Sequence, residues 1–152
     1  MYREILENYA KENKWVKIQP PAQMQDIKKA EEYVGHPFPD ELVKLLLELN
    51  GDKWLILSTE EIIETAFNTR EYLSECYKDI HNHIFFAGNG CGDYYCYNVS
   101  VDGIVEEENI YIVDDNFLVS KERLLAFCRG LDERKIHKHF IAYARADYIV
   151  KN

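Results

Sequence analysis

Residues 83–114 constrain the fold more than any other part of the chain, because four short apolar runs follow one another there with no helical stretch between them. The runs are "HIFFA", "YYCYNVS", "GIVEE" and "IYIVD", and they are rich in the β-branched and aromatic residues that favour strands. Turn residues separate them, including Asp102-Gly103 between the second and the third. An earlier run, "KWLIL", is also expected to be a short strand. The pattern predicts an antiparallel β-meander of about four to five strands.

The chain before the meander shows helical spacing of its apolar residues. A short helical segment is expected ahead of the proline-rich break "QPPAQ". Two helices fit residues 26–52, and Gly35 is a natural stop for the first of them. A third helix is expected to begin at the capping-box pair Ser58 and Glu61.

The chain after the meander is expected to return to helix. Ser120 is positioned to cap a helix over "KERLLAFCRG", and residues 132–146, "DERKIHKHFIAYARA", are predicted to form a last helix. Helices, then a contiguous antiparallel sheet, then helices define an α+β fold. The length suits one domain over residues 1–152 with a real hydrophobic core. Residues expected in that core are Leu42, Leu46, Ile84, Phe86 and Ile112.

The sequence carries no signal for a membrane or for secretion. No apolar run approaches the ~20 residues that cross a bilayer, and the N-terminal "MYREILENYAKENK" lacks the apolar centre of a signal peptide. The cysteines are scattered rather than arranged as a dense disulfide framework: Cys76, Cys91, Cys96 and Cys128. We therefore expect a reduced, cytoplasmic protein with no membrane partner.

Charge is distributed unevenly along the chain. The net charge is −9, yet residues 79–120 contain no Lys or Arg, whereas residues 121–152 carry a net charge of +4. An acidic middle repels nucleic acid and membrane surfaces and attracts basic partners. Solubility is the usual reason for surface charge, but 42 consecutive residues without a positive charge exceed what solubility requires. A basic protein partner, and no nucleic acid, is the resulting expectation.

The glycine-rich loop "GNGCGD", residues 88–93, has three possible interpretations: a phosphate cradle, a metal site or a hairpin turn. A P-loop needs Lys and Ser or Thr at the mouth of a helix, but Asp93 and a strand follow Gly92. The residues able to bind zinc miss the usual ligand spacing: His81, His83, Cys91 and Cys96. We therefore expect a structural turn at Gly88–Gly92, with no cofactor and no metal.

No catalytic motif stands out in the sequence. There is no Gly-x-Ser-x-Gly elbow, and no Cys and His share a recognisable local signature. Carboxylates are so numerous, with 27 acidic residues, that some pairs lie close together by chance. A catalytic pair such as Asp114 with Glu107 stays open as an alternative.

Several motifs follow one another in an order that is typical of one family. A helix with an Ile/Ala-Glu pattern ends in Gly, an apolar-Pro step follows, a Leu-rich helix ends in Asn-Gly, and a Gly-rich turn precedes an aromatic strand. The residues that carry this order are Ile27, Ala30, Glu31, Gly35, Phe38, Pro39, Leu42, Leu46, Asn50, Gly51, Gly90 to Asp93, Tyr94 and Tyr95. This succession resembles the SUKH superfamily, named after a fungal cell-wall regulator and its relatives, and the resemblance is strongest over residues 24–130.

The resemblance implies an α+β fold and, for bacterial members, an immunity protein that binds and neutralises a cognate toxin. The hypothesis is a binding protein, not an enzyme, whose acidic surface occludes the basic cleft of a toxin's C-terminal domain, often a nuclease. Two alternatives stay open: a regulatory interaction scaffold for an endogenous partner, and a small enzyme with a carboxylate or metal site in the meander. The expected partner-binding residues are Glu106, Glu107, Glu108, Asp114 and Asp115.

Overall fold

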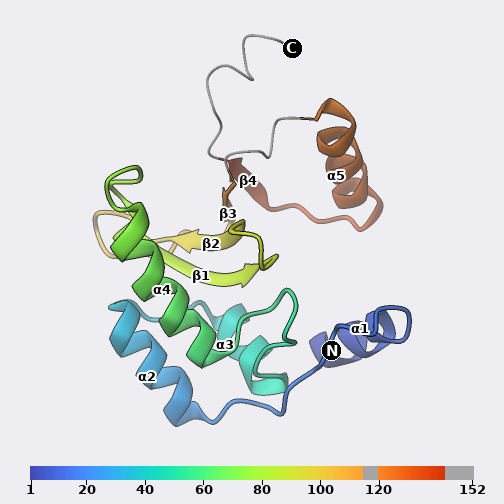
Figure 1. Ribbon diagram of the computed structural model, residues 1–152, viewed down its shortest axis with the longest axis horizontal. Coiled ribbons are helices and arrows are strands. Elements are labelled where there is room, and N and C mark those ends of the chain that lie inside the picture. Colours follow the sequence, from blue (N-terminus) through green and yellow to red (C-terminus); the bar gives the residue numbers. More distant parts are fainter. Residues whose placement is uncertain (115–119, 143–152) are drawn as a thin grey trace.

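The computed structural model describes residues 1–114 and 120–142 and confirms the α+β fold. Figure 1 shows the sheet lying across one side of a layer of helices. The helices are α1 (Tyr2–Ala10), α2 (Met24–Val34), α3 (Asp40–Glu48), α4 (Thr59–Leu73) and α5 (Lys121–Glu133), and a single 3₁₀ turn spans Ile80–Asn82. The strands are β1 (His83–Gly88), β2 (Tyr94–Asn98), β3 (Asn109–Val113) and β4 (His139–Ala142).

The expected helix boundaries are present as local hydrogen bonds. Ser58 Oγ accepts a hydrogen bond from the Glu61 backbone N–H at 3.2 Å, and the Glu61 carboxylate accepts one from the Ser58 N–H at 2.8 Å, which is a complete capping box. Gly35 ends α2 with φ of 88°, a left-handed conformation that glycine adopts without strain. Local sequence therefore determines where α2 ends and α4 begins.

The described part of the sheet has the strand order β1-β2-β3-β4. The first three strands are antiparallel neighbours, as predicted. Two of the shorter predicted strands are wrong as strands: "KWLIL" contributes only the isolated bridge Ile56–Ala87, and "GIVEE" only Val99–Val105. The first bridge joins segments far apart in the chain and the second closes a local turn, but neither pairing extends beyond one residue pair.

The predicted helix over residues 132–146 is a correction. The helix α5 ends at Glu133, and His139–Ala142 forms β4, which pairs in parallel with β3 through Ile110 opposite Phe140. Residues 143–146 of that prediction lie outside the described residues. Parallel neighbours need a long crossover connection, which the segment containing α5 supplies. The apolar residues of this segment are spaced as in a helix, but the unpaired backbone groups at the edge of β3 bind the segment as a strand. The sequence pattern of the segment alone does not show that this edge is available.

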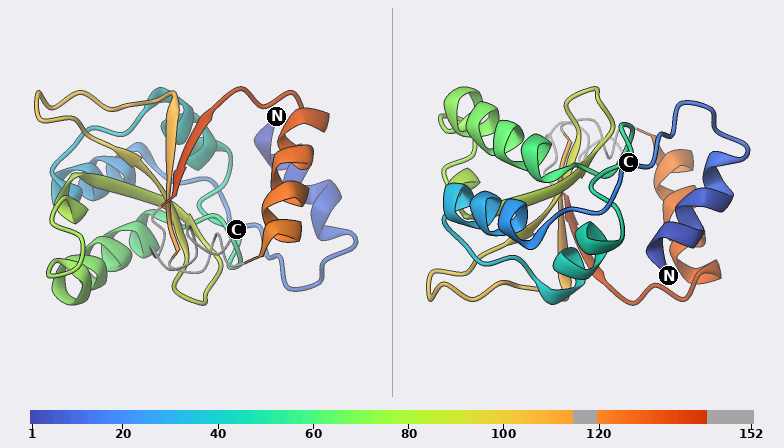
Figure 2. Two further views of the ribbon diagram at one scale, coloured as in Figure 1. Left: turned by 90° about the horizontal axis from the view of Figure 1, so that it is seen from above. Right: turned by 90° about the horizontal axis from the view of Figure 1, so that it is seen from below.

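The two faces of the sheet carry different parts of the core, because neighbouring strand residues point to opposite sides. The face toward α2, α3 and α4 includes Ile84, Tyr97, Val99 and Ile110. The opposite face forms a second, smaller cluster of Ile80, Phe85, Cys96 and Val113. Figure 2 shows the helix layer on one side of the sheet and α5 beyond the β4 edge, away from α2 and α4.

Most of the predicted core residues are buried. Leu42, Leu46, Ile84 and Ile112 are at most 2% exposed, which confirms their assignment. Phe86 is only half-buried, at the edge of the larger cluster. The pairing of β1 with β2 shifts register between Phe85 and Ala87, and a strand residue at such a bulge loses its regular neighbours.

Candidate functional site

The acidic turn Glu106–Glu108 lies directly before β3. Its backbone is fixed on both sides, because the Glu106 N–H donates to the Asn98 carbonyl at 2.9 Å and the Glu106 carbonyl accepts from the Asn109 N–H at 3.1 Å. The Glu106 carboxylate is partly occupied, since it accepts a hydrogen bond from the Tyr111 hydroxyl at 2.9 Å. Glu107 and Glu108 are exposed. The turn therefore presents two carboxylates to solvent on a rigid backbone.

A fourth carboxylate, Glu41 in the first turn of α3, joins this turn in space. Lys138 Nζ lies 3.2 Å from the Glu41 carboxylate and donates to the Glu107 carbonyl at 2.7 Å. Burial, followed by the negative charges of Glu41 and Glu107, raises the pKa of Tyr97 to about 12. We define Glu41, Glu106, Glu107 and Glu108 as the acidic patch. No sequence signal links Glu41 to the turn, because acidic residues are common in first helical turns for local reasons.

The basic C-terminal region meets the acidic patch at the start of β4. The His139 N–H donates to the Glu108 carbonyl at 2.9 Å, and the His139 Nδ1 lies 3.3 Å from the Asn109 side-chain oxygen. Together with Lys138, these contacts fix β4 beside the acidic turn. One role of the positive residues after 120 is therefore to hold β4 on the sheet, a role that their composition alone did not indicate.

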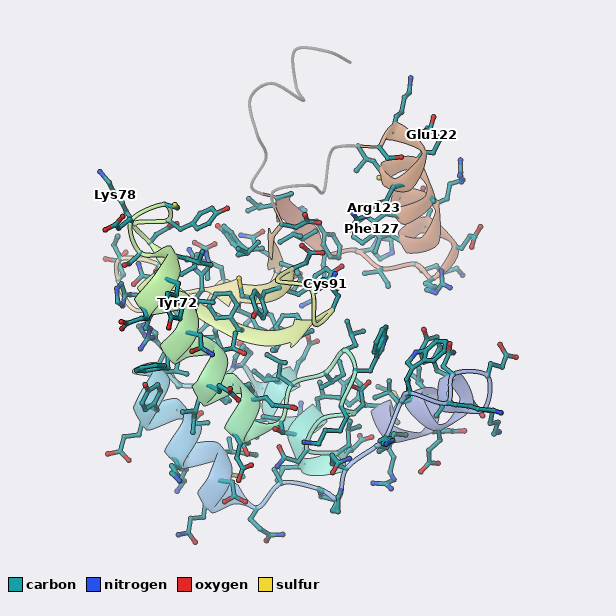
Figure 3. All side chains as sticks on the ribbon, viewed as in Figure 1. Tyr72, Lys78, Cys91, Glu122, Arg123 and Phe127 are labelled. Atoms are coloured by element: carbon teal, nitrogen blue, oxygen red, sulfur yellow. The ribbon has the colours of Figure 1, made fainter. Side chains whose placement is uncertain are left out.

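Asp114, at the other end of β3, is not an exposed carboxylate. It is 3% exposed as a residue and forms an ion pair with Arg123 of α5 at 3.2 Å. Figure 3 shows Arg123 and Phe127 on the side of α5 nearer the sheet. Phe127 packs edge-on against Phe140 of β4, with ring centroids 5.1 Å apart. The placement of Asp114 on a shared acidic surface is thus corrected: its carboxylate anchors α5. Asp115 lies outside the described residues.

Another acidic residue, Asp93, lies near the Asp114–Arg123 pair, directly before β2. Burial raises the pKa of the Asp93 carboxyl, a hydrogen bond from Asn89 opposes the shift, and the nearby Asp114 adds to it. Burial also raises the pKa of Tyr95 on the same strand. The two ends of β3 therefore differ in kind: two exposed carboxylates lie at the start, whereas at the end the buried Asp114 carboxylate is paired with the partly exposed Arg123.

The glycine-rich loop is a hairpin turn between β1 and β2, as predicted. Asn89 organises it, because its side-chain oxygen accepts hydrogen bonds from the Cys91 N–H at 2.8 Å and the Asp93 N–H at 3.3 Å. Gly90 and Gly92 have φ of 71° and 95°, where other residues are strained. Gly90 and Gly92 thus serve the backbone of the turn, whereas Gly88 is the last residue of β1.

The residues considered for zinc binding are not brought together. Strand pairing places Cys91 in the turn at one end of the β1–β2 hairpin, while His83 pairs with Asn98 at the other end. Over residues 1–114 and 120–142, no three His, Cys, Asp or Glu side chains are close enough to hold a metal ion.

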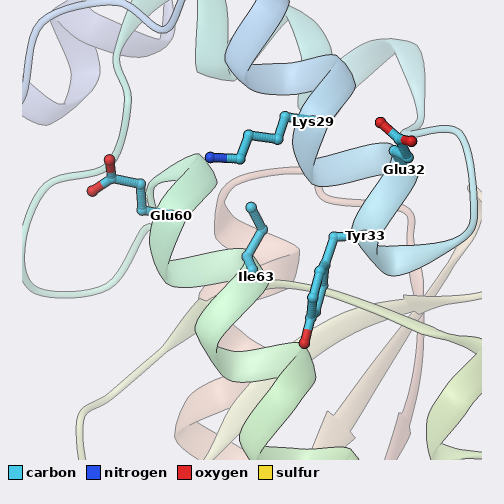
Figure 4. A pocket seen from close by; sticks show the side chains of 5 residues that line it. All are labelled: Lys29, Glu32, Tyr33, Glu60 and Ile63. Atoms are coloured by element: carbon cyan, nitrogen blue, oxygen red, sulfur yellow. The ribbon is translucent and has the colours of Figure 1, made fainter.

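A separate groove of about 600 Å³ lies between α2 and α4 (Figure 4). Its lining side chains are Lys29, Glu32, Tyr33, Glu60 and Ile63. The Lys29 amino group is directed toward the side of Glu60, while Glu32 points away from both (Figure 4). The two carboxylates do not face each other, so this groove lacks the paired geometry that acid–base work by two carboxylates requires.

Comparison with known proteins gives one informative match. The model of the SMI1 / KNR4 family (SUKH-1) matches residues 21–133, a range that runs from just before α2 to the end of α5. No curated protein matches the chain. None of the described helices is both long and apolar enough to span a membrane. The acidic turn, the glycine loop and the Asp114–Arg123 pair all lie inside the matched range.

Proposed function

This chain belongs to the SMI1 / KNR4 family (SUKH-1), and from that membership we propose that it is an immunity protein, which binds a cognate bacterial toxin domain and blocks it. The family fits toxin-immunity proteins in general and protein partners as a kind. An immunity protein acts by occupying a surface, so it needs complementarity to its partner rather than catalytic groups of its own. We propose that it does so in the cytoplasm.

The observation that supports a basic partner is the acidic patch. It combines side chains from α3 and from the turn before β3, and both Glu107 and Glu108 are exposed. Toxins that cleave nucleic acid carry basic clefts that bind phosphate. Carboxylates arranged in front of such a cleft would steer the two proteins together and exclude the substrate. We propose a nuclease domain at the C-terminus of the toxin as the target.

The structure changes which residues carry this proposal. Glu107 and Glu108 stay as proposed contact residues, and Glu41 is added to them. Glu106 is half-buried and adds its negative charge at the edge of the acidic patch. Lys138 lies within the patch and reduces its negative potential. Asp114 enters only indirectly, because it holds α5 and with it the crossover to β4 beside the patch.

The test uses the C-terminal domain encoded by a neighbouring toxin gene. Co-purification shows whether the two proteins associate. Glu107→Lys with Glu108→Lys should slow association by about tenfold at low salt and flatten its salt dependence, since charge at an interface rim acts mainly on the association rate. The matched control, Glu71→Lys with Glu75→Lys, reverses two exposed charges of the segment around the end of α4. Equal effects of both pairs would mean that only net charge matters.

A further inference from the structure

A second feature suited to recognition is a cavity of about 270 Å³ beside the glycine loop. It lies between the first half of α4, the connection from α3 to α4 and the turn from β1 to β2. Figure 1 shows this connection rising toward that turn. We call it the Trp54 pocket, and its lining residues include Trp54, Glu64, Asn68, Gly88, Gly90 and Tyr94. It is at the opposite end of β2 and β3 from the acidic patch.

The backbone around Trp54 is fixed by one buried carboxylate. Asp52 is 1% exposed, and its Oδ1 accepts hydrogen bonds from the backbone N–H groups of Trp54 at 2.9 Å and Leu55 at 2.7 Å. The Leu55 carbonyl then accepts from the Gly88 N–H at 2.8 Å, which ties this connection to β1. Trp15 packs on the Trp54 indole, with centroids 5.7 Å apart. The pocket is thus already formed without a partner.

The glycines keep the opposite wall free of side chains. A Cβ at Gly88 would lie 3.0 Å from Cδ1 of the Tyr94 ring, which shows how closely that ring covers the strand. Tyr94 itself is fixed by an edge-on contact with Phe85, with centroids 5.5 Å apart. Gly90, with φ of 71°, also lines the pocket, and a Cβ at this position would meet no other atom within 4 Å. Trp54 and Tyr94 therefore line, together with the two glycines, a space that the loop does not fill.

The charge of the lining is not balanced. Lys53 is offset by Glu61, at 3.6 Å, and the other oxygen of Glu61 accepts the capping hydrogen bond from Ser58 at 2.8 Å. Glu64 is exposed and has no ion pair with any residue that the structure describes. Asn68, one helical turn later, adds a half-buried amide. One carboxylate beside two aromatic rings is left available to a ligand.

We infer that the Trp54 pocket receives one arginine side chain of the protein partner. The volume is below the ~300–1,000 Å³ of pockets for drug-sized molecules, so a single long side chain is the matching occupant. A guanidinium group is planar, stacks on aromatic rings and donates paired hydrogen bonds to a carboxylate, which an ammonium group does not. The inference rests on the proposed function for the identity of the partner, but the chemistry of the pocket can be tested without a toxin.

The experiment is an NMR titration of the ¹⁵N-labelled protein with the peptide acetyl-Gly-Arg-Gly-amide. Saturable shifts are expected at the Trp54 indole N–H and at the Gly88 and Gly90 amides. The same peptide with citrulline, a neutral analogue of arginine, should give none of these shifts, and the lysine peptide should bind more weakly. Glu64→Gln should weaken the arginine peptide by about tenfold, because a hydrogen bond to a charged group is lost. Glu71→Gln, an exposed change on the same helix, should leave binding unchanged.

Three results would overturn the inference: no saturable shift at Trp54, equal binding of the citrulline or lysine peptide, or equal binding by the Glu64→Gln protein. An unchanged remainder of the spectrum shows that this variant is folded. Failure here leaves the acidic patch untouched, because the peptide reports only on the Trp54 pocket. Conversely, if a toxin domain does not bind the acidic patch, the result of the peptide titration is unaffected, because no toxin is present in it.

Discussion

The two ends of β3 look alike in the sequence and differ in the structure. Each end has an acidic cluster, Glu106–Glu108 before the strand and Asp114-Asp115 after it. At the first end, Glu107 and Glu108 are exposed, and the contacts of the turn pass mainly through its backbone. At the second end, Asp114 is buried and paired with Arg123. Similar charge in a sequence therefore has two different environments, exposed carboxylates at one end and a buried carboxylate that attaches α5 at the other.

The difference teaches that the partner of a carboxylate decides its role. Arg123 follows Asp114 by nine positions and reaches it because α5 lies beside the β4 edge. The exposed turn also has a cation nearby, Lys138, but that cation binds the Glu107 carbonyl and the Glu41 carboxylate. The side chains of Glu107 and Glu108 are thus left for solvent or for a protein partner.

The largest expected loss of stability comes from a substitution in the hydrophobic core. It is the reference against which the losses at the two ends of β3 are compared. Leu46→Ala should lower the free energy of unfolding by about 2–5 kcal/mol, because Leu46 is fully buried and truncation leaves a cavity. Leu47→Ala is the matched control, since Leu47 lies on the same helix and is 40% exposed. Chemical denaturation of both variants measures the difference. Equal losses would show that the helix layer packs differently.

The next effect is expected at the buried end of β3. Asp114→Asn should cost about 1–3 kcal/mol, because a buried charged acceptor loses its strongest hydrogen bonds. Arg123→Ala and the double variant complete a thermodynamic cycle that isolates the coupling between the two residues. If the two single losses simply add, the pair does not anchor α5, and the contrast between the ends of β3 fails.

A pH effect is expected from the end of the sheet that carries the acidic turn. His83 pairs with Asn98 there and is fully buried, and burial lowers its pKa below the usual value near 6.5. The unfolded chain therefore binds a proton more readily than the folded one, so stability is complete above pH 6.5 and falls as the pH drops below it. Unfolding curves between pH 5 and 8 measure this slope. His83→Gln should remove part of it, whereas His137→Gln, an exposed change, should not.

The smallest effect on stability is expected at the exposed end. Glu107→Gln with Glu108→Gln should change the free energy of unfolding by about 0.5 kcal/mol or less, as is usual for exposed side chains. The same double variant should weaken binding of a basic partner, so stability and recognition separate at this end. A loss as large as that of Asp114→Asn would contradict the comparison, because both ends of β3 would then be structural.

The local parts of the fold were predictable because short-range chemistry decides them. The Ser58–Glu61 capping box, the Gly35 helix stop and the Asn89-Gly90 region of the hairpin turn all act within a few residues. The segment His139–Ala142 was predicted wrongly, since its strand conformation depends on the edge of β3, about 30 positions earlier. The short runs "KWLIL" and "GIVEE" were also predicted wrongly, because each forms only one bridging residue pair and the local pattern does not show how far a pairing extends.

The candidate sites, like the fold, have parts that the sequence predicts and parts that only the tertiary structure decides. The sequence by itself determined the α+β fold, the family and the exposed acidic turn, because alternating apolar residues and turn residues act locally. Only the tertiary structure buried Asp114 against Arg123, brought Glu41 to the acidic turn and joined Trp54, Glu64 and Gly88 around one pocket. These residues lie far apart in the chain or on different elements, and their proximity follows from how helices and strands pack. The composition of a chain records how many charges it has, whereas packing decides which of them a partner can reach.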